Sequence, residues 1–503
     1  MEWKKLLSTE KFLQEESHKD DYYFENYPIN DFEKDYNKII SSAAFRRLQD
    51  KTQVFPLDKS DFIRTRLTHS IEVSTIARQL GLMLLDSQHR YKFKDKLKND
   101  DMEVVKDIPS ILSCAGLLHD FGNPPFGHFG EFVIGDWFKD YIENNEYKGE
   151  SIKKRLSPQM IKDLENYEGN AQTFRILAKA RNNAEINLSY AVICALVKYP
   201  TDSTSFDNES EDIKKHKPGY FFAEEEAFFE MCEKVGTKND NGEIYRHPLA
   251  FLLEAADDIA YATSDLEDSF KKSMFILPQF IEYFRLCYEP EDAKYDDKKE
   301  RYNQKPEVFS EFLIFDLEER LNENKRLDKN KRKDETEIFK NWISHVKRWL
   351  MYAVVYRFLG SYDGIMNGRY KADLFHNTYH SKTIKILQGA MKEFVFDSSE
   401  ILKLELASQN IIPFLLDKFV NAFLYYECGK CDECNKCNKC KLSKSDKKYI
   451  EIFSSNYKND YMNFKNEDEN FNLYLRLLMV ADYVSGMTDT FARTLYRELS
   501  GND

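Results

Sequence analysis

A mostly α-helical fold is predicted by three observations. Apolar residues recur at three- and four-residue spacing in long segments, alternating strand-like patterns are scarce, and polar, charge-rich stretches separate the periodic segments. The expected helical segments are 68–85, 186–199, 247–270, 348–359 and 471–499. The expected exposed loops are 91–101, 201–217, 291–305 and 322–335. Helix starts are expected at Thr68 and at His247-Pro248.

The composition limits the classes of function. The chain has 503 residues, and 73 basic against 86 acidic side chains give it a formal net charge of −13. This acidic balance disfavours a broad nucleic-acid surface but allows a local group of cations. We find no apolar run of about 18 residues and no signal-peptide pattern, so the cytoplasm is the expected location and no membrane contact is expected.

The stretch LLHDFGNPPFGHFGE at residues 117–131 carries the strongest chemical signal. Its adjacent His119 and Asp120 follow an apolar segment, and both side chains can bind one metal ion. Hydrolytic metal sites usually have three or four protein ligands and an open position for water. His69 and Asp257, each in an expected helix, are candidates for the missing ligands. Taken alone, each also fits a structural role, as a packed histidine or a solvated carboxylate.

Two further spacings indicate side chains that act together. His128 and Glu131 lie three residues apart after a break that contains glycine and proline, so a helix beginning there places both on one face. The carboxylate can then fix the tautomer of the imidazole. Asp257, Tyr261 and Asp265 are spaced four apart, which predicts one shared helix face.

Three motifs, in this order, resemble the HD-superfamily deoxynucleotide triphosphohydrolases, with the closest similarity to the bacterial deoxyguanosine triphosphate triphosphohydrolases: RTRLTHSIEV (64–73), LLHDFGNPPFGHFGE (117–131) and EAADDIAYATSDLED (254–268). Further matches are FRRLQDKTQVFP (45–56), YEGNAQTFRIL (167–177), VKYP (197–200) and VADYVSGMTD (480–489). The HD dipeptide alone is weak evidence, whereas the extended set is specific. The resemblance implies a mostly α HD-domain helical fold with additional helices. It also implies a single domain 1–503 with an HD core over about 40–275 and a C-terminal helical part over about 276–503.

The resemblance also implies roles for individual residues. The implied metal ligands are His69, His119, Asp120 and Asp257, and the implied catalytic pair is His128 and Glu131. The implied substrate-binding residues are Gln53, Val54, Arg66, Asn170, Lys198, Tyr199, Tyr261, Asp265, Phe396 and Glu405. Mixed nitrogen and carboxylate ligands suit Mn²⁺ or Mg²⁺, and are also compatible with Fe²⁺ or Zn²⁺.

Within this set, Arg66 and Lys198 are expected to bind the triphosphate, as a bidentate cation and a point charge. By resemblance, Tyr261 and Asp265 contact the deoxyribose, while the final two residues, Phe396 and Glu405, reach the guanine base.

The implied reaction is metal-dependent hydrolysis of dGTP, or of other deoxynucleoside triphosphates (dNTPs), to the deoxynucleoside and inorganic tripolyphosphate. The family also implies a homo-oligomer, with a hexamer favoured, and single-stranded DNA as an effector. Two alternatives stay open. One is an HD phosphodiesterase acting on cyclic or oligonucleotide substrates, and the other is a non-catalytic sensor of nucleotides or single-stranded DNA. The metal, the base selectivity and any nucleotide activator are not fixed by the sequence.

Five cysteines repeat at every third position and have no counterpart in the family, which predicts a small Cys-rich insertion over 428–440. They are Cys428, Cys431, Cys434, Cys437 and Cys440. Thiolates at this spacing suit an additional zinc ion. The same spacing also matches part of an iron–sulfur motif, although the proline that follows in that motif is missing. A thiol loop that binds no metal is the third alternative.

Overall fold

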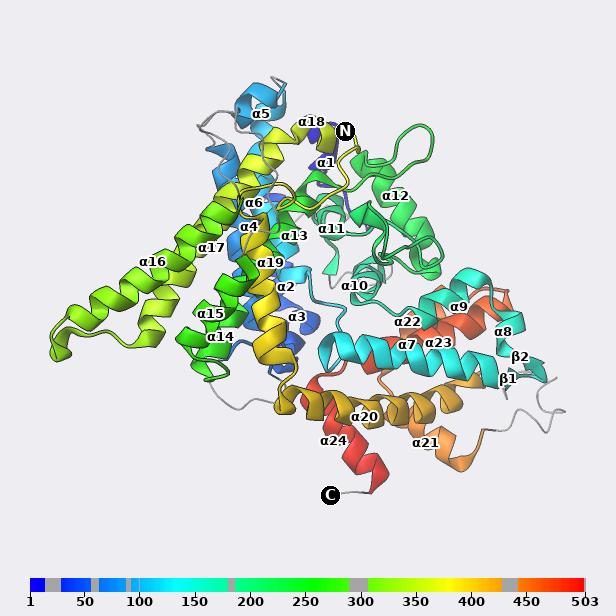
Figure 1. Cartoon of the computed structure of the whole chain (residues 1–503). Helices are drawn as coiled ribbons and strands as arrows, with labels where there is room; N and C mark the ends of the chain where they lie inside the picture. Colours follow the sequence, from blue (N-terminus) through cyan, green and yellow to red (C-terminus); the bar gives the residue numbers. More distant parts are fainter. Residues whose placement is uncertain are drawn as a thin grey trace.

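The computed structural model describes residues 1–13, 29–55, 63–86, 92–98, 100–179, 186–288, 306–427 and 442–501. Within these residues the protein is mostly helical, as the sequence predicts (Figure 1). The two-stranded sheet of the described part consists of β1 (Glu146–Tyr147) and β2 (Glu150–Ser151), which pair antiparallel. The predicted Cys-rich insertion, Cys428 to Cys440, lies outside the described residues.

The α-helices are α1 (Trp3–Leu6), α2 (Asp31–Ser41), α3 (Ala43–Arg47), α4 (Arg66–Leu85), α5 (Asp101–Val104), α6 (Ile108–Leu118), α7 (Gly127–Asn144), α8 (Ile152–Arg155), α9 (Pro158–Glu165), α10 (Gly169–Ala178), α11 (Tyr190–Leu196), α12 (Glu225–Val235), α13 (Pro248–Ala260), α14 (Leu266–Lys271), α15 (Leu277–Tyr288), α16 (Pro306–Arg326), α17 (Glu335–Gly360), α18 (Tyr362–Met366), α19 (Ser381–Met391), α20 (Ser399–Leu424), α21 (Lys444–Ile452), α22 (Ser455–Phe464), α23 (Glu469–Ser485) and α24 (Asp489–Ser500). The 3₁₀ turns are η2 (Leu48–Asp50), η3 (Phe93–Lys96), η4 (Val105–Asp107), η7 (Ile213–Lys215), η8 (Phe222–Glu224) and η10 (Lys329–Lys331). Two π turns are η9 (Tyr261–Asp265) and η11 (Lys392–Phe396).

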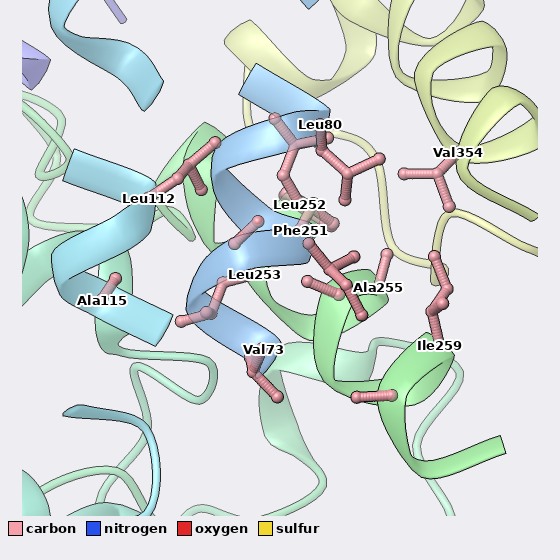
Figure 2. Close-up of a cluster of buried hydrophobic side chains, with 14 of the residues drawn as sticks. Val73, Leu80, Leu112, Ala115, Phe251, Leu252, Leu253, Ala255, Ile259 and Val354 are labelled. Atoms are coloured by element: carbon pink, nitrogen blue, oxygen red, sulfur yellow. The ribbon is translucent and has the colours of Figure 1, made fainter. Parts of the chain in front are cut away.

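One hydrophobic core forms where α4, α6, α13 and α17 meet (Figure 2). Val73 of α4, Leu252 of α13 and Val354 of α17 are fully buried there. The helices α4 and α6 approach closely because Gly116 has no side chain: a Cβ at this position would lie 2.5 Å from the Cα of Ser74. This packing fixes the two helix ends that carry the predicted metal ligands.

A second core lies between α7, α20 and α23, in the lower part of Figure 1. A buried ion group connects α23 to α10, because Arg175 donates to both carboxylate oxygens of Asp482, at 2.8 and 2.9 Å. Arg175 also pairs with Glu224. The group holds α10, which carries Asn170, against the C-terminal helices.

Several helix boundaries differ from the prediction. Helix α4 begins at Arg66 rather than at Thr68, because Thr65 is the N-cap and Thr68 completes a capping box with it. The start at His247-Pro248 is confirmed, since His247 caps α13 and the proline is its first residue. The segment 247–270 is not one continuous α-helix, because the π turn η9 separates α13 from α14.

The other expected segments that lie within the described residues are mostly of the correct type with shifted boundaries, whereas the expected loop 291–305 lies outside the described residues. The expected helix 471–499 is split into α23 and α24, and the expected helix 348–359 is part of the longer α17. Helix α16 extends to Arg326, inside the expected loop 322–335. The expected loop 201–217 is confirmed apart from one 3₁₀ turn. Tertiary packing, which a periodicity window does not include, decides where these helices end.

No helix of the described residues is long and apolar enough to cross a membrane.

Candidate active site

Three helix ends bring the predicted metal ligands together. His69 lies in the first turn of α4, His119 directly follows α6, and Asp257 lies in the last turn of α13. The Oδ1 atom of Asp257 is 3.4 Å from Nε2 of His69 and 3.5 Å from Nε2 of His119. One ligand atom of each residue lies within 4.8 Å of the other two, a spacing that fits a single metal ion.

Hydrogen bonding prepares His119 for a metal. Its Nδ1 lies 2.8 Å from the carbonyl oxygen of Gly116, so this nitrogen carries the proton and Nε2 keeps a free lone pair. Nε2 is buried and has no hydrogen-bond partner among the described residues. A buried, unpaired imidazole nitrogen that faces two other potential ligands fits a divalent cation.

Asp120 lies beside this group but is held by two other side chains. Its Oδ2 is 3.3 Å from Nε2 of His119, yet the same oxygen accepts a 2.7 Å hydrogen bond from Nη1 of Arg66. Its Oδ1 accepts from Nδ2 of Asn123 at 2.6 Å. The structure therefore brings three predicted ligands together directly and places the fourth next to them in an ion pair.

The electrostatics keep both carboxylates ionised. Burial acts to raise the pKa of Asp257, but Lys198, whose Nζ lies 2.6 Å from Oδ2, and the two histidines lower it far below its ordinary value. Burial likewise acts to raise the pKa of Asp120, and Arg66 and His119 lower it. The negative charge that a cation requires is thus present at neutral pH.

The predicted catalytic pair is formed at the start of α7. Nδ1 of His128 lies 2.9 Å from Oε2 of Glu131, and the histidine side chain is 72% exposed while that of Glu131 is 8% exposed. The other carboxylate oxygen of Glu131 accepts from the backbone N–H of Gly169 at 3.1 Å. A Cβ at residue 169 would lie 2.6 Å from that oxygen and 2.2 Å from Oδ1 of Asn123, so a larger residue there would displace both side chains. The interaction with Glu131 raises the pKa of His128, which favours the imidazolium.

Three cations lie near the His/Asp group and the His128–Glu131 pair. Arg66 and Lys198 are the cations that the sequence predicts, and both are held by the carboxylates described above. The third, Lys217, was not predicted; it donates to Glu168 at 3.1 Å and is close enough for its charge to act on His128. Its only sequence signal is the basic run at 214–217, inside a stretch interpreted as an exposed loop.

A small pocket opens beside Lys198 and His119. Its lining residues are His119, Asn170, Thr173, Phe174, Leu196, Val197, Lys198 and Gly219. Asn170 donates to Glu168 at 2.7 Å, so the same carboxylate holds Asn170 and Lys217. Tyr199, the neighbour of Lys198, is half-buried, and burial raises its pKa to about 12.

Four of the residues predicted to contact the sugar and base contact one another in pairs, and one of them, Asp265, is close enough to His69 for their charges to interact. Nε2 of Gln53 donates to Asp265 at 3.2 Å. The rings of Tyr261 and Phe396 stack at 6.3 Å with an interplanar angle of 8°. Burial raises the pKa of Asp265 to about 6, although His69 and Gln53 favour its ionised form.

Two predicted residues take no part in these polar contacts. Val54, next to Gln53, is buried in the apolar core. Glu405 lies on α20 at intermediate burial, and in the described part of the chain its side chain makes no hydrogen bond to another predicted site residue. The contacts of Glu405 therefore do not support its predicted role in base recognition.

The loop between α6 and α7 is held by residues that the sequence did not single out. Lys51 donates to the carbonyl oxygens of Asn123, at 2.5 Å, and of Ser485, at 2.9 Å, and burial lowers its pKa to about 7. Asp489 accepts from the backbone N–H of Phe126 at 3.0 Å. Phe126 has a φ of 66°, an unfavourable conformation for a bulky residue, so this hydrogen bond helps to hold the turn.

A His/Asp group at three helix ends, beside an exposed histidine paired with a buried glutamate and several cations, defines a hydrolase site of the HD type. The HD domain family matches residues 66–199. A "Deoxyguanosinetriphosphate triphosphohydrolase-like protein" of Listeria innocua is 37% identical over 93% of this chain and 94% of its own length. A protein of the same name from Synechocystis is 30% identical over 100% of this chain and 99% of its own length. The "Deoxyguanosinetriphosphate triphosphohydrolase" of Serratia proteamaculans is 29% identical over 94% of each chain. The chain belongs to the deoxyguanosinetriphosphate triphosphohydrolase family of HD-domain proteins, and it is an enzyme of the hydrolase class.

Proposed function

We propose that the protein hydrolyses deoxynucleoside triphosphates, with dGTP as the expected substrate, to the deoxynucleoside and inorganic tripolyphosphate. The observation that carries this proposal is the set of contacts that joins the His/Asp group to its neighbours: Lys198 donates to Asp257, and Arg66 donates to Asp120. The charge of Arg66 also acts on His128 of the His128–Glu131 pair. The names of the relatives support the same reaction.

We propose Mn²⁺ or Mg²⁺ as the metal, with Fe²⁺ and Zn²⁺ also compatible with the ligand types. When bound, such a cation polarises a phosphoryl oxygen and lowers the pKa of a coordinated water. His69 and His119 would each contribute Nε2, and Asp257 the Oδ1 that faces them, while Lys198 keeps its contact with Oδ2. Asp120 would join more readily if Arg66 exchanged its contact with this carboxylate for another anion, because Arg66 and the metal would compete for Oδ2.

A triphosphate provides that anion. Arg66 can donate to phosphate oxygens through two parallel N–H groups, and Lys217, whose charge also acts on His128, can add a second positive charge. Substrate binding and metal coordination by Asp120 would then favour each other. A phosphate that binds Arg66 releases the carboxylate of Asp120, which can then bind the metal.

His128 transfers a proton in the proposed reaction. Glu131 holds Nδ1, so Nε2 is the nitrogen available to the substrate. Because Glu131 favours the imidazolium, His128 is suited to donate a proton to the 5′-oxygen of the departing deoxynucleoside. The exposed position of the ring places it where a substrate can reach it.

Preference for a deoxynucleotide would come from Tyr261 and Asp265. The aromatic ring next to the sugar excludes a 2′-hydroxyl, and the carboxylate accepts from the 3′-hydroxyl. The stacked Phe396 extends this surface towards the base. Assignment of Glu405 to guanine recognition rests on the resemblance of the sequence alone.

A panel of nucleotides tests the proposal. Purified protein is incubated with Mn²⁺ or Mg²⁺ and each dNTP, and tripolyphosphate, pyrophosphate and orthophosphate are separated. Tripolyphosphate from dGTP is the expected product. Release of pyrophosphate or orthophosphate instead would refute the reaction, and cleavage of cyclic dinucleotides or oligonucleotides would favour a phosphodiesterase. Full activity of His128→Ala would show that this pair is not catalytic, and nucleotide binding without turnover in the wild type would favour a sensor.

Three further properties are proposed from the family. We expect a homo-oligomer, with a hexamer favoured, single-stranded DNA as an effector, and a cytoplasmic location. Light scattering at micromolar concentration tests the first, and a monomer mass with full activity would refute it. Addition of a single-stranded oligonucleotide to the dGTP assay tests the second. Fractionation of the producing cells tests the third.

A further inference from the structure

An ion cluster lies behind the proposed sugar-binding residues and has no part in the chemistry proposed above. Nε of Arg64 donates to Glu72 at 2.9 Å, and Arg64 also pairs with Asp268. Lys347, from α17, donates to Glu72 at 2.6 Å. The four side chains are only 3–23% exposed, so their charges are poorly screened by solvent. We call these four residues the Glu72 cluster.

The Glu72 cluster converges on one residue of the π turn η9. The hydroxyl of Ser264 donates to Glu72, and it accepts from Nζ of Lys347 at 3.1 Å. Nη1 of Arg64 donates to the backbone carbonyl oxygen of Ser264 at 3.1 Å. Ser264 is thus held through both its side chain and its backbone by three charged residues from other segments.

A π turn needs such external support. It contains more residues per turn than an α-helix, its hydrogen bonds run from i to i+5, and such turns are rare outside functional sites. If residues 261–265 returned to regular α-helix, the register of the chain would shift by one residue, and side chains would rotate by about 100° around the axis. Tyr261 and Asp265, at the two ends of the turn, would lose their present relation to Phe396 and Gln53.

We propose that Glu72 and Lys347 are positioning residues that hold the π turn, so that Tyr261 and Asp265 face the deoxyribose and discriminate against ribonucleotides. This inference rests on the proposed function, because it assigns the sugar selectivity of that same pocket. It makes α17, which lies outside the matched HD segment, a determinant of substrate choice. The cluster stays charged at neutral pH, because Lys347 and Arg64 lower the pKa of Glu72 to about 2 although burial acts to raise it.

The decisive variant is Lys347→Met, which keeps the apolar stem and removes the charge that bridges α17 to Ser264. Glu72 keeps Arg64 as a partner in this variant, so the loss of folding stability is smaller than for a change at Glu72 itself. KM and kcat are measured for dGTP and for GTP. We expect a rise of about tenfold or more in the KM for dGTP, because displacements of about 1 Å cost up to 10²-fold. We also expect a smaller effect on kcat and a lower ratio of dGTP to GTP turnover.

The matched controls separate positioning from general damage. Lys340→Met removes an exposed lysine two turns earlier on the same helix and is expected to leave both parameters unchanged. Lys347→Arg keeps the charge and is expected to restore most of the selectivity. Ser264→Ala removes only the hydroxyl contact and replaces Lys347→Met in the assay should that variant melt below the assay temperature.

The possible outcomes are distinct. An unchanged KM and an unchanged dGTP-to-GTP ratio in folded Lys347→Met, or in Ser264→Ala, would overturn the inference while the proposed function stands. A wild-type protein without activity on any dNTP would refute the proposed function itself, and with it the selectivity role assigned to the cluster. A fall in kcat with unchanged KM and unchanged ratio would contradict positioning of the sugar residues.

Discussion

Replacement of Glu131 by glutamine gives a sharp test of the catalytic pair. The two oxygens of Glu131 accept from different donors, Nδ1 of His128 at 2.9 Å and the backbone N–H of Gly169 at 3.1 Å. A glutamine has one acceptor oxygen. That oxygen is expected to accept from the buried N–H of Gly169, because leaving this N–H without a partner would cost about 1–3 kcal/mol. The amide NH₂ of the glutamine then faces Nδ1 of His128. The imidazole must then carry its proton on Nε2 alone, so it cannot be the imidazolium that Glu131 favours.

The size of the effect follows from this change of tautomer. General acid–base catalysis contributes about 10²–10⁴-fold, so kcat for dGTP should fall by about 10²-fold or more, equal to about 2.7 kcal/mol in the barrier. The remaining activity should also decline at a lower pH than in the wild type, because Glu131 raises the pKa of His128 and its loss lets that pKa fall. The imidazolium is then lost earlier as the pH rises.

The assay is tripolyphosphate release from dGTP across pH, with thermal melting to verify the fold. Glu143→Gln, on the exposed part of α7, is the matched control and should retain full activity. The double variant of His128→Ala and Glu131→Gln should be no slower than His128→Ala alone. A decrease in kcat of less than threefold, or an unchanged alkaline limb, would refute the reasoning.

Three other predictions concern metal binding and stability. His69→Ala should remove the metal that the active site binds and abolish hydrolysis, as elemental analysis and the dGTP assay together would show; full metal content would exclude His69 as a ligand. Replacement of Cys431 and Cys434 by serine should lower bound zinc or iron by about one equivalent per chain without loss of dGTP hydrolysis, and unchanged metal content would remove the support for a second site. Arg175→Met should lower the free energy of unfolding by about 3–5 kcal/mol, because it leaves the buried Asp482 carboxylate without its main partner; urea denaturation measures this, and a change under 1 kcal/mol would contradict it.

The sequence predicted the parts of the site that lie in short, chemically distinctive motifs. His119 and Asp120 are adjacent, and His128 and Glu131 follow at a spacing that a helix turns into contact. The mostly α fold followed from periodicity, and most helix boundaries shifted because packing and caps decide them. The grouping of His69 with Asp257 came from resemblance, since no local rule brings residues 188 positions apart within 3.4 Å.

Other features of the site have no recognisable pattern in the sequence. Lys217 lies in a polar run that resembles a surface loop, and only the folded chain shows that it pairs with Glu168 close enough to His128 for its charge to act there. The π turn is invisible to a helix pattern, because Tyr261 and Asp265 keep the spacing of an ordinary α-helix in the sequence. Lys51 is a buried lysine, and burial of a lysine can be recognised only when its acceptors, here two backbone carbonyl groups, are known.

The hydrogen bond from Phe126 to Asp489 has a consequence for biosynthesis. The turn between the proposed metal ligands and His128 is held by a carboxylate 363 residues further along the chain. The first 260 residues contain α4, α6 and α13, but the turn has no partner until Asp489 has been synthesised. If the proposed function holds, a nascent chain is therefore expected to gather the proposed metal ligands before it can turn over nucleotide.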